Sequence, residues 1–243
     1  MGFFIILPVM TGQNIPLMAR ISLCLGLAML AFTANAVILP DYVFSIMGFG
    51  MLLVQEFAIG LILGFVVMIF FSMFHFIGQL VDYQMGFSMV TVFDPFGQLQ
   101  TPITGNLFYL LVSVFFIYTG LLHHVIFIFF ETFTILGMGE AIVLGNYQIP
   151  RLAIAMIVEY FAFGLRVAIP FIGTLVTIDV VLGILVKAVP QMNVFVVGLP
   201  LKVFVGLILL FLLMPMLADA FTYVANQLAG HLIEITRAMI PLE

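Results

Sequence analysis

The chain has 243 residues, of which 65% are hydrophobic and 7% are charged, and its formal net charge is −5. Soluble domains carry about 25% charged residues, so this composition excludes an ordinary soluble domain and predicts an integral membrane protein built from helices. The sequence has no basic tract, which argues against a nucleic-acid partner. The single cysteine, Cys24, has no second cysteine in the chain with which to form a disulfide.

The first ten residues, "MGFFIILPVM", predict a short or buried helix. They are too few to span a membrane, and they lack the basic region and cleavage site of a signal peptide. The following "TGQNIP" predicts a turn, in which Pro16 is placed to start the next helix.

Five long apolar blocks follow, and each is expected to be helical: residues 15–39, 44–81, 103–130, 152–189 and 194–228. The "PQMN" stretch at 190–193 predicts a tight turn that folds the last two blocks into a hairpin. Residues 233–243 predict an amphipathic tail.

The second, fourth and fifth blocks are longer than a membrane span requires. A span needs about 20 residues for a hydrocarbon core of about 30 Å, whereas about 35 helical residues extend for about 50 Å. Either each block holds two short helices, or its helix leaves the bilayer while staying buried in protein. Breakers inside the blocks favour long, kinked helical hairpins, and these breakers are Gly48, Gly50, Pro170, Pro200 and Pro215.

Gly60 and Gly64 form a GxxxG face in the second block. Such a face lets two helix backbones approach closely. The contact could be made within one subunit or between subunits, and we favour the first.

Several charged residues lie inside or at the ends of the apolar blocks: Glu56, Glu159, Arg166, Asp179, Lys187, Lys202 and Asp219. Such charges should face protein or water, either along an ion pathway or, as we prefer, in pairs between helices. Folding the last two blocks about 190–193 places Arg166 and Asp219 about equally far from the turn, so we expect similar depth and a buried pair. An alternative function is a small secondary transporter with a midplane site at Glu56, Arg166 and Asp179.

No catalytic or metal-binding pattern stands out in the sequence. The four histidines, His75, His123, His124 and His231, do not have metal-ligand spacing. No phosphate-binding loop or Ser-His-Asp arrangement is evident. We therefore expect no enzymatic activity, no metal and no cofactor.

The segment 82–102, which contains "QMGFSMVTVFDPFG", is long for a connection and too interrupted by polar residues for a span. It is rich in Met and Phe, which seek burial. Irregular backbone at membrane depth persists only inside protein or along a cavity, and a deformable collar of Met and Phe can close a pore and yield to a passing object. The alternative is a loop that lies on the outside of the protein.

Three separated motifs resemble one family: "VDYQMGFSMVTVFDP" with "GQLQTPITG", then "LHHVIFIFFETFTILGMGEA", then "VKAVPQMNVFVVGLPLKVFVGL". They are similar, in order and spacing, to the FliR family of flagellar biosynthesis proteins in the type III export gate. Injectisome proteins are close relatives of that family. The resemblance covers nearly the whole chain.

The resemblance implies a non-enzymatic subunit that helps form and seal the pore for unfolded flagellar proteins, in the bacterial inner membrane at the flagellar basal body. One copy would assemble with five FliP and four FliQ subunits and contact other export apparatus proteins. Residues 1–243 would form one membrane domain. Within it, 1–150 would be a FliP-like part with a plug loop at 82–102, and 151–243 would be a FliQ-like hairpin with a C-terminal tail.

By the same resemblance, two sets of residues have roles. The plug would consist of Met85, Gly86, Phe87, Ser88, Met89, Val90, Thr91, Val92, Phe93 and Asp94. The hairpin turn and its assembly contacts would involve Lys187, Pro190, Gln191, Pro200 and Lys202. The chain departs from the family pattern in a shorter first helix, and in having Met89 and Val92 where phenylalanine is expected.

Overall fold

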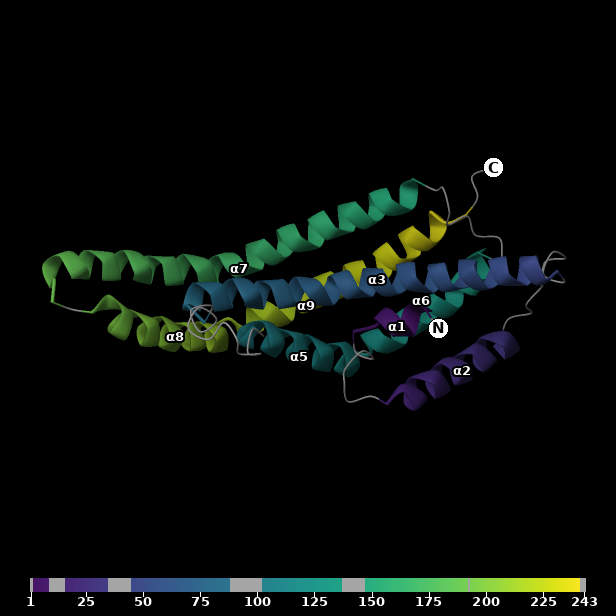
Figure 1. The fold of residues 1–243 in the computed structure, drawn as a ribbon, viewed down its shortest axis with the longest axis horizontal. Coiled ribbons are helices and arrows are strands. Elements are labelled where there is room, and N and C mark those ends of the chain that lie inside the picture. Colours follow the sequence, from purple (N-terminus) through teal and green to yellow (C-terminus); the bar gives the residue numbers. More distant parts are fainter. Residues whose placement is uncertain are drawn as a thin grey trace. The chain divides into compact units, whose positions relative to one another are not determined.

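A computed structural model describes residues 2–8, 16–34, 45–87, 102–136, 147–191 and 193–240. Within these ranges every regular element is an α-helix, so the predicted all-α fold is confirmed. The helices, drawn in Figure 1, are α1 (Gly2–Ile6), α2 (Leu17–Ala34), α3 (Ile46–Met85), α5 (Ile103–Tyr118), α6 (Leu121–Leu136), α7 (Gln148–Ala188), α8 (Val194–Leu212) and α9 (Met214–Arg237).

The blocks that are longer than a membrane span adopt two kinds of structure. The second and fourth blocks are single helices, because α3 has 40 residues and α7 has 41. The fifth block breaks at Leu213, two residues before Pro215, whose ring would clash with the carbonyl four residues earlier in a continuous helix. By contrast, Gly48 and Gly50 lie within α3, and Pro170 and Pro200 lie within α7 and α8.

The third block also breaks, although its apolar pattern predicted one helical block over residues 103–130. Helices α5 and α6 meet at a bend of 69°. Gly120 lies at the bend with φ +74°, a left-handed conformation that glycine adopts without steric cost. Its amide donates to the carbonyl of Ile117, and its carbonyl accepts from the amides of His123 and His124, so the bend is closed by its own hydrogen bonds.

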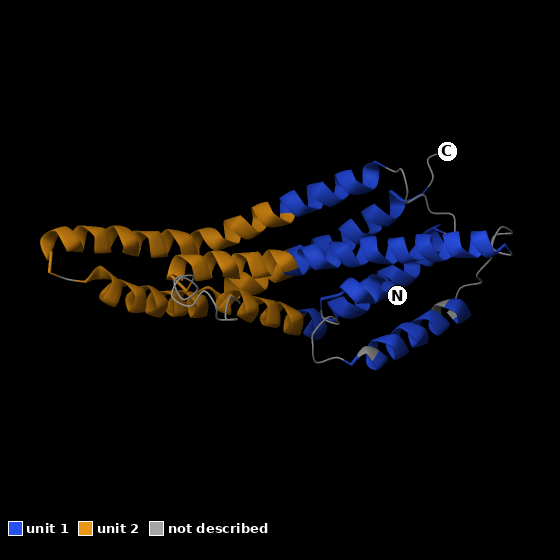
Figure 2. Ribbon diagram, viewed as in Figure 1, with its two compact units in different colours: residues 1–71, 116–159, 224–243 blue, residues 72–115, 160–223 orange. Residues whose placement is uncertain are grey.

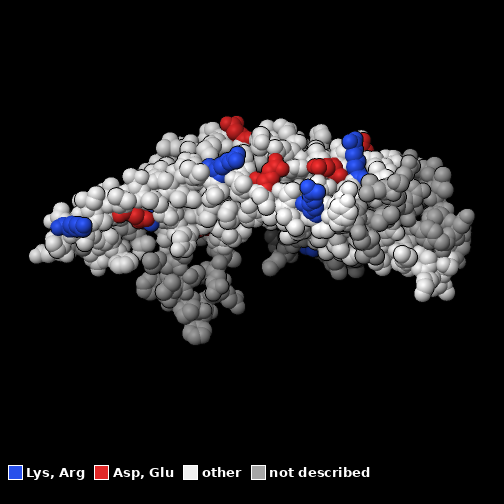
Figure 3. Space-filling view, turned by 90° about the horizontal axis from the view of Figure 1, so that it is seen from above, with Lys and Arg blue, Asp and Glu red and all other residues white. Residues whose placement is uncertain are grey.

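In the described part of the chain, three helices, α3, α7 and α8, are long and apolar enough to cross a membrane, and the bent pair α5–α6 would make a fourth crossing. In the most apolar 18-residue stretch of α3, 61% is buried, whereas only 17% is buried in the corresponding stretches of α7 and α8. Figure 3 shows how sparse the charged side chains are on the face that it views. The protein is therefore an all-α integral membrane protein in which α3 is the most enclosed of the three spans and α7 and α8 expose apolar side chains.

The chain forms two compact units, coloured in Figure 2, and each is assembled from separate stretches of sequence. Unit 1 contains residues 1–71, 116–159 and 224–243, and unit 2 contains residues 72–115 and 160–223. Both units draw on residues before and after position 150. This division does not test the likeness of 1–150 to FliP and of 151–243 to FliQ, which stays a prediction.

In unit 1 the N-terminal helix α1 is buried against α3. The ring of Phe3 is fully buried and stacks on Phe129 with a centroid distance of 4.9 Å. A Cβ atom added to Gly60 would lie 2.8 Å from the amide nitrogen of Phe3, and one added to Gly64 would lie 3.0 Å from the carbonyl oxygen of Phe3. The GxxxG face is thus used for close packing within this chain, as expected, and the predicted buried helix is confirmed.

In unit 2 aromatic side chains of four helices make the core. The ring of Phe221 in α9 contacts Phe74 of α3 and Phe115 of α5, with centroid distances of 6.2 and 5.5 Å. Phe108 of α5 contacts the fully buried Phe171 of α7 at 6.4 Å. Helix α9 meets this core with apolar residues spaced three or four apart, as one face of an amphipathic helix requires.

The predicted hairpin between the last two blocks is confirmed. Helix α7 ends at Ala188 and α8 begins at Val194, with Pro190 and Gln191 in the turn. The side chain of Asn193 caps α8 by accepting from the amide of Phe195 at 3.1 Å. Further along the hairpin, a Cβ atom on Gly198 would lie 3.1 Å from Cδ1 of Leu182, so the two helices pack closely.

Candidate functional site: the end of helix α3

Helix α3 ends through a glycine that reverses the backbone. Gly86 has φ +88°, its amide donates to the carbonyl of Tyr83 at 3.2 Å, and the amide of Phe87 donates to the carbonyl of Asp82 at 3.1 Å. These are the two hydrogen bonds of a Schellman motif. The predicted plug loop began at Asp82, which is wrong by four residues: the helix continues to Met85 because the left-handed residue that stops it is Gly86.

The α3–α5 connection, residues 86–102, therefore leaves from Gly86 and returns at the start of α5. The carboxylate of Asp82 is buried, with 5% of the residue exposed. It accepts from the amide of Thr104 at 2.9 Å to each oxygen, and from the amide of Gly105 at 3.1 Å. We call this contact the Asp82 clamp. It caps the first turn of α5, where backbone amides have no partner within the helix and a negative charge is favoured.

Beside the Asp82 clamp, the backbones of α3 and α5 touch. A Cβ atom on Gly78 would lie 2.7 Å from the carbonyl carbon of Thr104, and one on Gly105 would lie 3.2 Å from the carbonyl oxygen of His75. A side chain at Gly78 would collide with the backbone of α5, and one at Gly105 would be tightly confined. The two ends of the α3–α5 connection are consequently fixed side by side.

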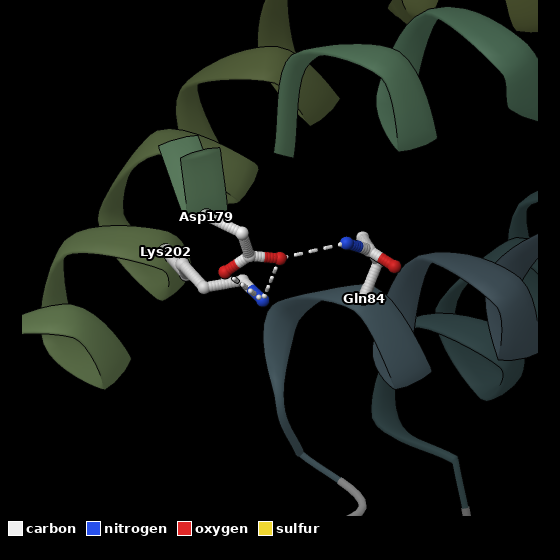
Figure 4. Close-up of polar contacts among 3 residues, drawn as sticks. All are labelled: Gln84, Asp179 and Lys202. Carbon is white, nitrogen blue, oxygen red and sulfur yellow. Dashed lines mark hydrogen bonds and ion pairs between the residues drawn. The ribbon is translucent and has the colours of Figure 1, made fainter. Parts of the chain in front are cut away.

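On another side, the end of α3 meets the α7–α8 hairpin through Asp179, as Figure 4 shows. The ammonium nitrogen of Lys202 in α8 lies 2.9 Å from each carboxylate oxygen of Asp179 in α7. The side-chain amide of Gln84 in α3 donates to Oδ2 of Asp179 at 3.1 Å. We call these three residues the Asp179 bridge, because a single carboxylate joins three helices.

Side-chain packing supports the Asp179 bridge. Met85 is fully buried, and it fills the space that a side chain at Gly206 of α8 would need: a Cβ atom there would lie 3.0 Å from its sulfur. A Cβ atom on Gly86 would lie 2.6 Å from Cδ2 of Leu199, also in α8. The last turn of α3 is thus seated on α8.

Of the residues predicted to form the plug, the structure describes Met85, Gly86 and Phe87, and the remaining seven, residues 88–94, lie outside the described residues. Met85 is a buried residue of α3 and not part of a loop. Of the residues predicted for the hairpin, Lys187 is exposed in the last turn of α7. Lys202 belongs to the Asp179 bridge.

The predicted pair of Arg166 and Asp219 stays a prediction. Phe163 of α7 and Tyr223 of α9 stack with a centroid distance of 4.9 Å. Arg166 and Asp219 each lie about one helical turn closer to the hairpin than the aromatic residue on the same helix, which supports similar depth. Both side chains are exposed. No ion pair joins these two residues to each other in the described part of the chain.

The geometry argues against the alternative transporter site at Glu56, Arg166 and Asp179. Arg166 and Asp179 both belong to α7 and are 13 positions apart (179 − 166), or about 20 Å along a helix, too far apart to hold one small substrate. Asp179 instead binds Lys202 and Gln84.

Sequence reasoning missed the residues that matter most at this site: Asp82, Gln84 and Gly206. The Asp82 clamp joins residues 22 and 23 positions apart, and no short motif reveals such a contact. The ion pair of Asp179 and Lys202 could have been found, because these residues are about equally far from the turn at 190–193. The same argument was applied only to Arg166 and Asp219, which lie farther from the turn.

The end of α3 is a junction between helices. Its parts are backbone amides, one ion pair, one amide side chain and close-packed glycines. Within the described ranges no group of three or more His, Cys, Asp or Glu side chains could hold a metal ion. The arrangement can fix a segment in place, and it offers no nucleophile beside a base.

The fold and the junction define a helical membrane protein whose long central helix ends in a fixed turn. The sequence model of the family described as "Bacterial export proteins, family 1" matches residues 1–228. The chain therefore belongs to this family of bacterial export proteins, and the resemblance to the FliR family is confirmed.

Named relatives cover most of the chain. Flagellar biosynthetic protein FliR of Bacillus subtilis is 28% identical over 216 residues, which are 88% of this chain and 82% of the relative. Flagellar biosynthetic protein FliR of Escherichia coli is 29% identical over 231 residues, 94% of this chain and 86% of the relative. Surface presentation of antigens protein SpaR of Shigella flexneri is 25% identical over 209 residues, 86% of this chain and 79% of the relative.

Proposed function

We propose that this chain is a structural and gating subunit of the flagellar type III protein export channel. The observation that carries the proposal is the match of the export-protein family over residues 1–228. The two FliR relatives are named flagellar biosynthetic proteins and are more similar to this chain than SpaR is, by 28–29% against 25% identity. A flagellar role is therefore favoured over a role in an injectisome.

The proposal includes an assembly in the bacterial inner membrane at the flagellar basal body. One copy of this chain would join five FliP and four FliQ subunits and contact other export apparatus proteins. The low burial of the apolar stretches of α7 and α8 leaves large apolar surfaces, which lipid and partner subunits would cover. Partners would supply the energy for transport of the unfolded flagellar proteins.

Gating is proposed for the plug residues that follow the end of α3, Gly86 to Asp94, while Met85 holds the last turn of α3 against α8. The support is indirect: the two ends of the α3–α5 connection are held together by the Asp82 clamp, and the helix from which it leaves is held by the Asp179 bridge. A polypeptide conduit needs a deformable seal, because its cargo varies in sequence. Met and Phe side chains in this connection can supply such a seal.

Co-expression and purification test the subunit proposal. A tagged copy of this chain should be poorly recovered when it is expressed alone. It should be recovered in a complex of several different subunits when FliP and FliQ of the same bacterium are co-expressed, and mass spectrometry of the intact complex gives their ratio. Full recovery of a stable monomer or homodimer, with no partner bound in the co-expression, would contradict the proposal.

A further inference from the structure

We propose that Asp82 is a positioning residue for the plug: by capping α5 from α3, it fixes the separation between the two ends of the α3–α5 connection. The functional consequence rests on the proposed function, whereas the positioning itself depends only on described residues. Asp82 lies on α3 four residues before Gly86, and its partners are the second and third residues of α5.

The chemistry of the Asp82 clamp makes it hard to replace by other contacts. A carboxylate that accepts from backbone amides at a helix N-terminus makes short, charge-assisted hydrogen bonds. Both oxygens of Asp82 are used, and the residue is 5% exposed. In such a buried setting water cannot substitute for a lost acceptor, so the amides of Thr104 and Gly105 would be left without a partner.

The neighbouring contact of Gly78 with α5 has a different role from the Asp82 clamp. It lets the two backbones approach because neither Gly78 nor Gly105 carries a side chain. It therefore permits a close junction, and the carboxylate holds that junction closed. When the carboxylate is removed, the two amides can regain hydrogen bonds only from water, which favours separation of the two helix ends.

Spin labels at the two ends measure the separation directly. Tyr83 is 72% exposed at the end of α3 and Ile103 is 62% exposed at the start of α5, so Tyr83→Cys and Ile103→Cys in a Cys24→Ser chain provide two labelling sites. The purified full chain, with the partners it recovers, should show strong dipolar broadening in continuous-wave EPR. Singly labelled chains measure and remove any broadening between copies.

Asp82→Ala should reduce this broadening by about half or more, and Asp82→Asn, which keeps one acceptor oxygen, should reduce it less. The control, Glu234→Gln, removes one carboxylate from the exposed face of α9 in unit 1 and should leave the dipolar broadening unchanged. If Asp82→Ala does not assemble, the Asp82→Asn variant carries the test. Broadening that is unchanged in an Asp82 variant with normal assembly would overturn the proposal.

A second measurement connects the Asp82 clamp to the plug. Ion leak through the purified complex in proteoliposomes is measured for Asp82→Asn alone, for residues 87–93 replaced by Gly and Ser, and for both changes together. We expect Asp82→Asn to raise the leak in the natural chain and to add nothing when 87–93 are replaced. Equal increases in both backgrounds would overturn a role through the plug. A replacement of 87–93 that leaves the leak unchanged would contradict the proposed function, while the EPR result would still decide the positioning.

Discussion

The end of α3 is held on two sides, and the two sides are built differently. On the α5 side, the Asp82 clamp is buried, its donors are backbone amides, and the backbones touch at Gly78. On the hairpin side, the Asp179 bridge is made entirely of side chains, and Asp179 is 45% exposed while Lys202 is 15% exposed. The packing of Met85 against Gly206 adds a buried contact to the hairpin side.

This difference indicates which side can yield. A buried carboxylate that satisfies helix-terminal amides cannot be exchanged for water without cost. An ion pair that water reaches is worth about 0–1 kcal/mol, and water reaches this pair through the carboxylate of Asp179, which is 45% exposed. We therefore expect the α5 side to remain closed under all conditions and the hairpin side to be the adjustable one. Substitutions at four places test this contrast: Gly78, Asp82, Gly206 and the Asp179 bridge.

The largest effect is expected from Gly78→Ala. The added Cβ atom would collide with the backbone of α5 at Thr104 and Gly105, and backbone atoms cannot move aside as a flexible side chain can. The free energy of unfolding, measured by denaturant titration in mixed micelles, should fall by about 3 kcal/mol.

Gly173→Ala is the matched control for that substitution, because no atom lies within 4 Å of its added Cβ atom in α7. It should be neutral or stabilising by about 0.5–1 kcal/mol, since alanine favours a helix over glycine. A similar loss from both substitutions would mean that the contact at Gly78 has no special role.

Asp82→Ala should lower the free energy of unfolding by about 2–3 kcal/mol, because two buried amides lose a charged acceptor. Asp82→Asn should cost less, since one oxygen remains to accept. The neighbouring Tyr83→Phe is the control, because Tyr83 is 72% exposed and should tolerate the change. A neutral Asp82→Ala variant would remove the contrast between the two sides.

Gly206→Ala tests the buried part of the hairpin side. The added Cβ atom would meet the side chain of Met85, which can bend away, so the expected loss is about 1–2 kcal/mol. Combined with Met85→Ala, the double variant should lose less than the sum of the two single losses, because the collision disappears. Additive losses would show that Met85 does not occupy this space.

The smallest effect is expected from the Asp179 bridge. Asp179→Asn and Lys202→Met should each change the free energy of unfolding by about 0.2–1 kcal/mol, with a coupling of similar size in the double variant. The loss should shrink as salt is raised, because the carboxylate is partly exposed. A loss as large as that of Asp82→Ala would make the two sides equivalent.

Much of the fold follows from the apolar pattern and the helix breakers. The spans in α3, α7 and α8 and the hairpin at 190–193 were predicted, because these features are local in the sequence. The bend at Gly120 was not, because a single glycine inside an apolar run is equally compatible with a helix interior. Only the left-handed backbone and the bonds that close it distinguish the bend.

The candidate site was predictable only in part. The pattern drew attention to the Met- and Phe-rich segment after α3, but it placed the start of the loop at Asp82, where a polar residue interrupts the block. The carboxylate of Asp82 accepts hydrogen bonds from the first turn of α5. Because its partner Thr104 is 22 positions away, this contact leaves no periodic signal in the sequence. The place where the helix stops is instead set by Gly86, which was visible in the sequence and was not weighed as a helix cap.

The central claim is that the connection after α3 seals a shared conduit and is held by a closed junction. Its most direct test is the ion conductance of the purified multi-subunit complex in a planar bilayer, with residues 87–93 either natural or replaced by Gly and Ser. We predict a closed complex with the natural sequence and a steady conductance after replacement, at equal subunit composition. A replaced complex that assembles normally and remains as tight as the natural one would contradict the claim.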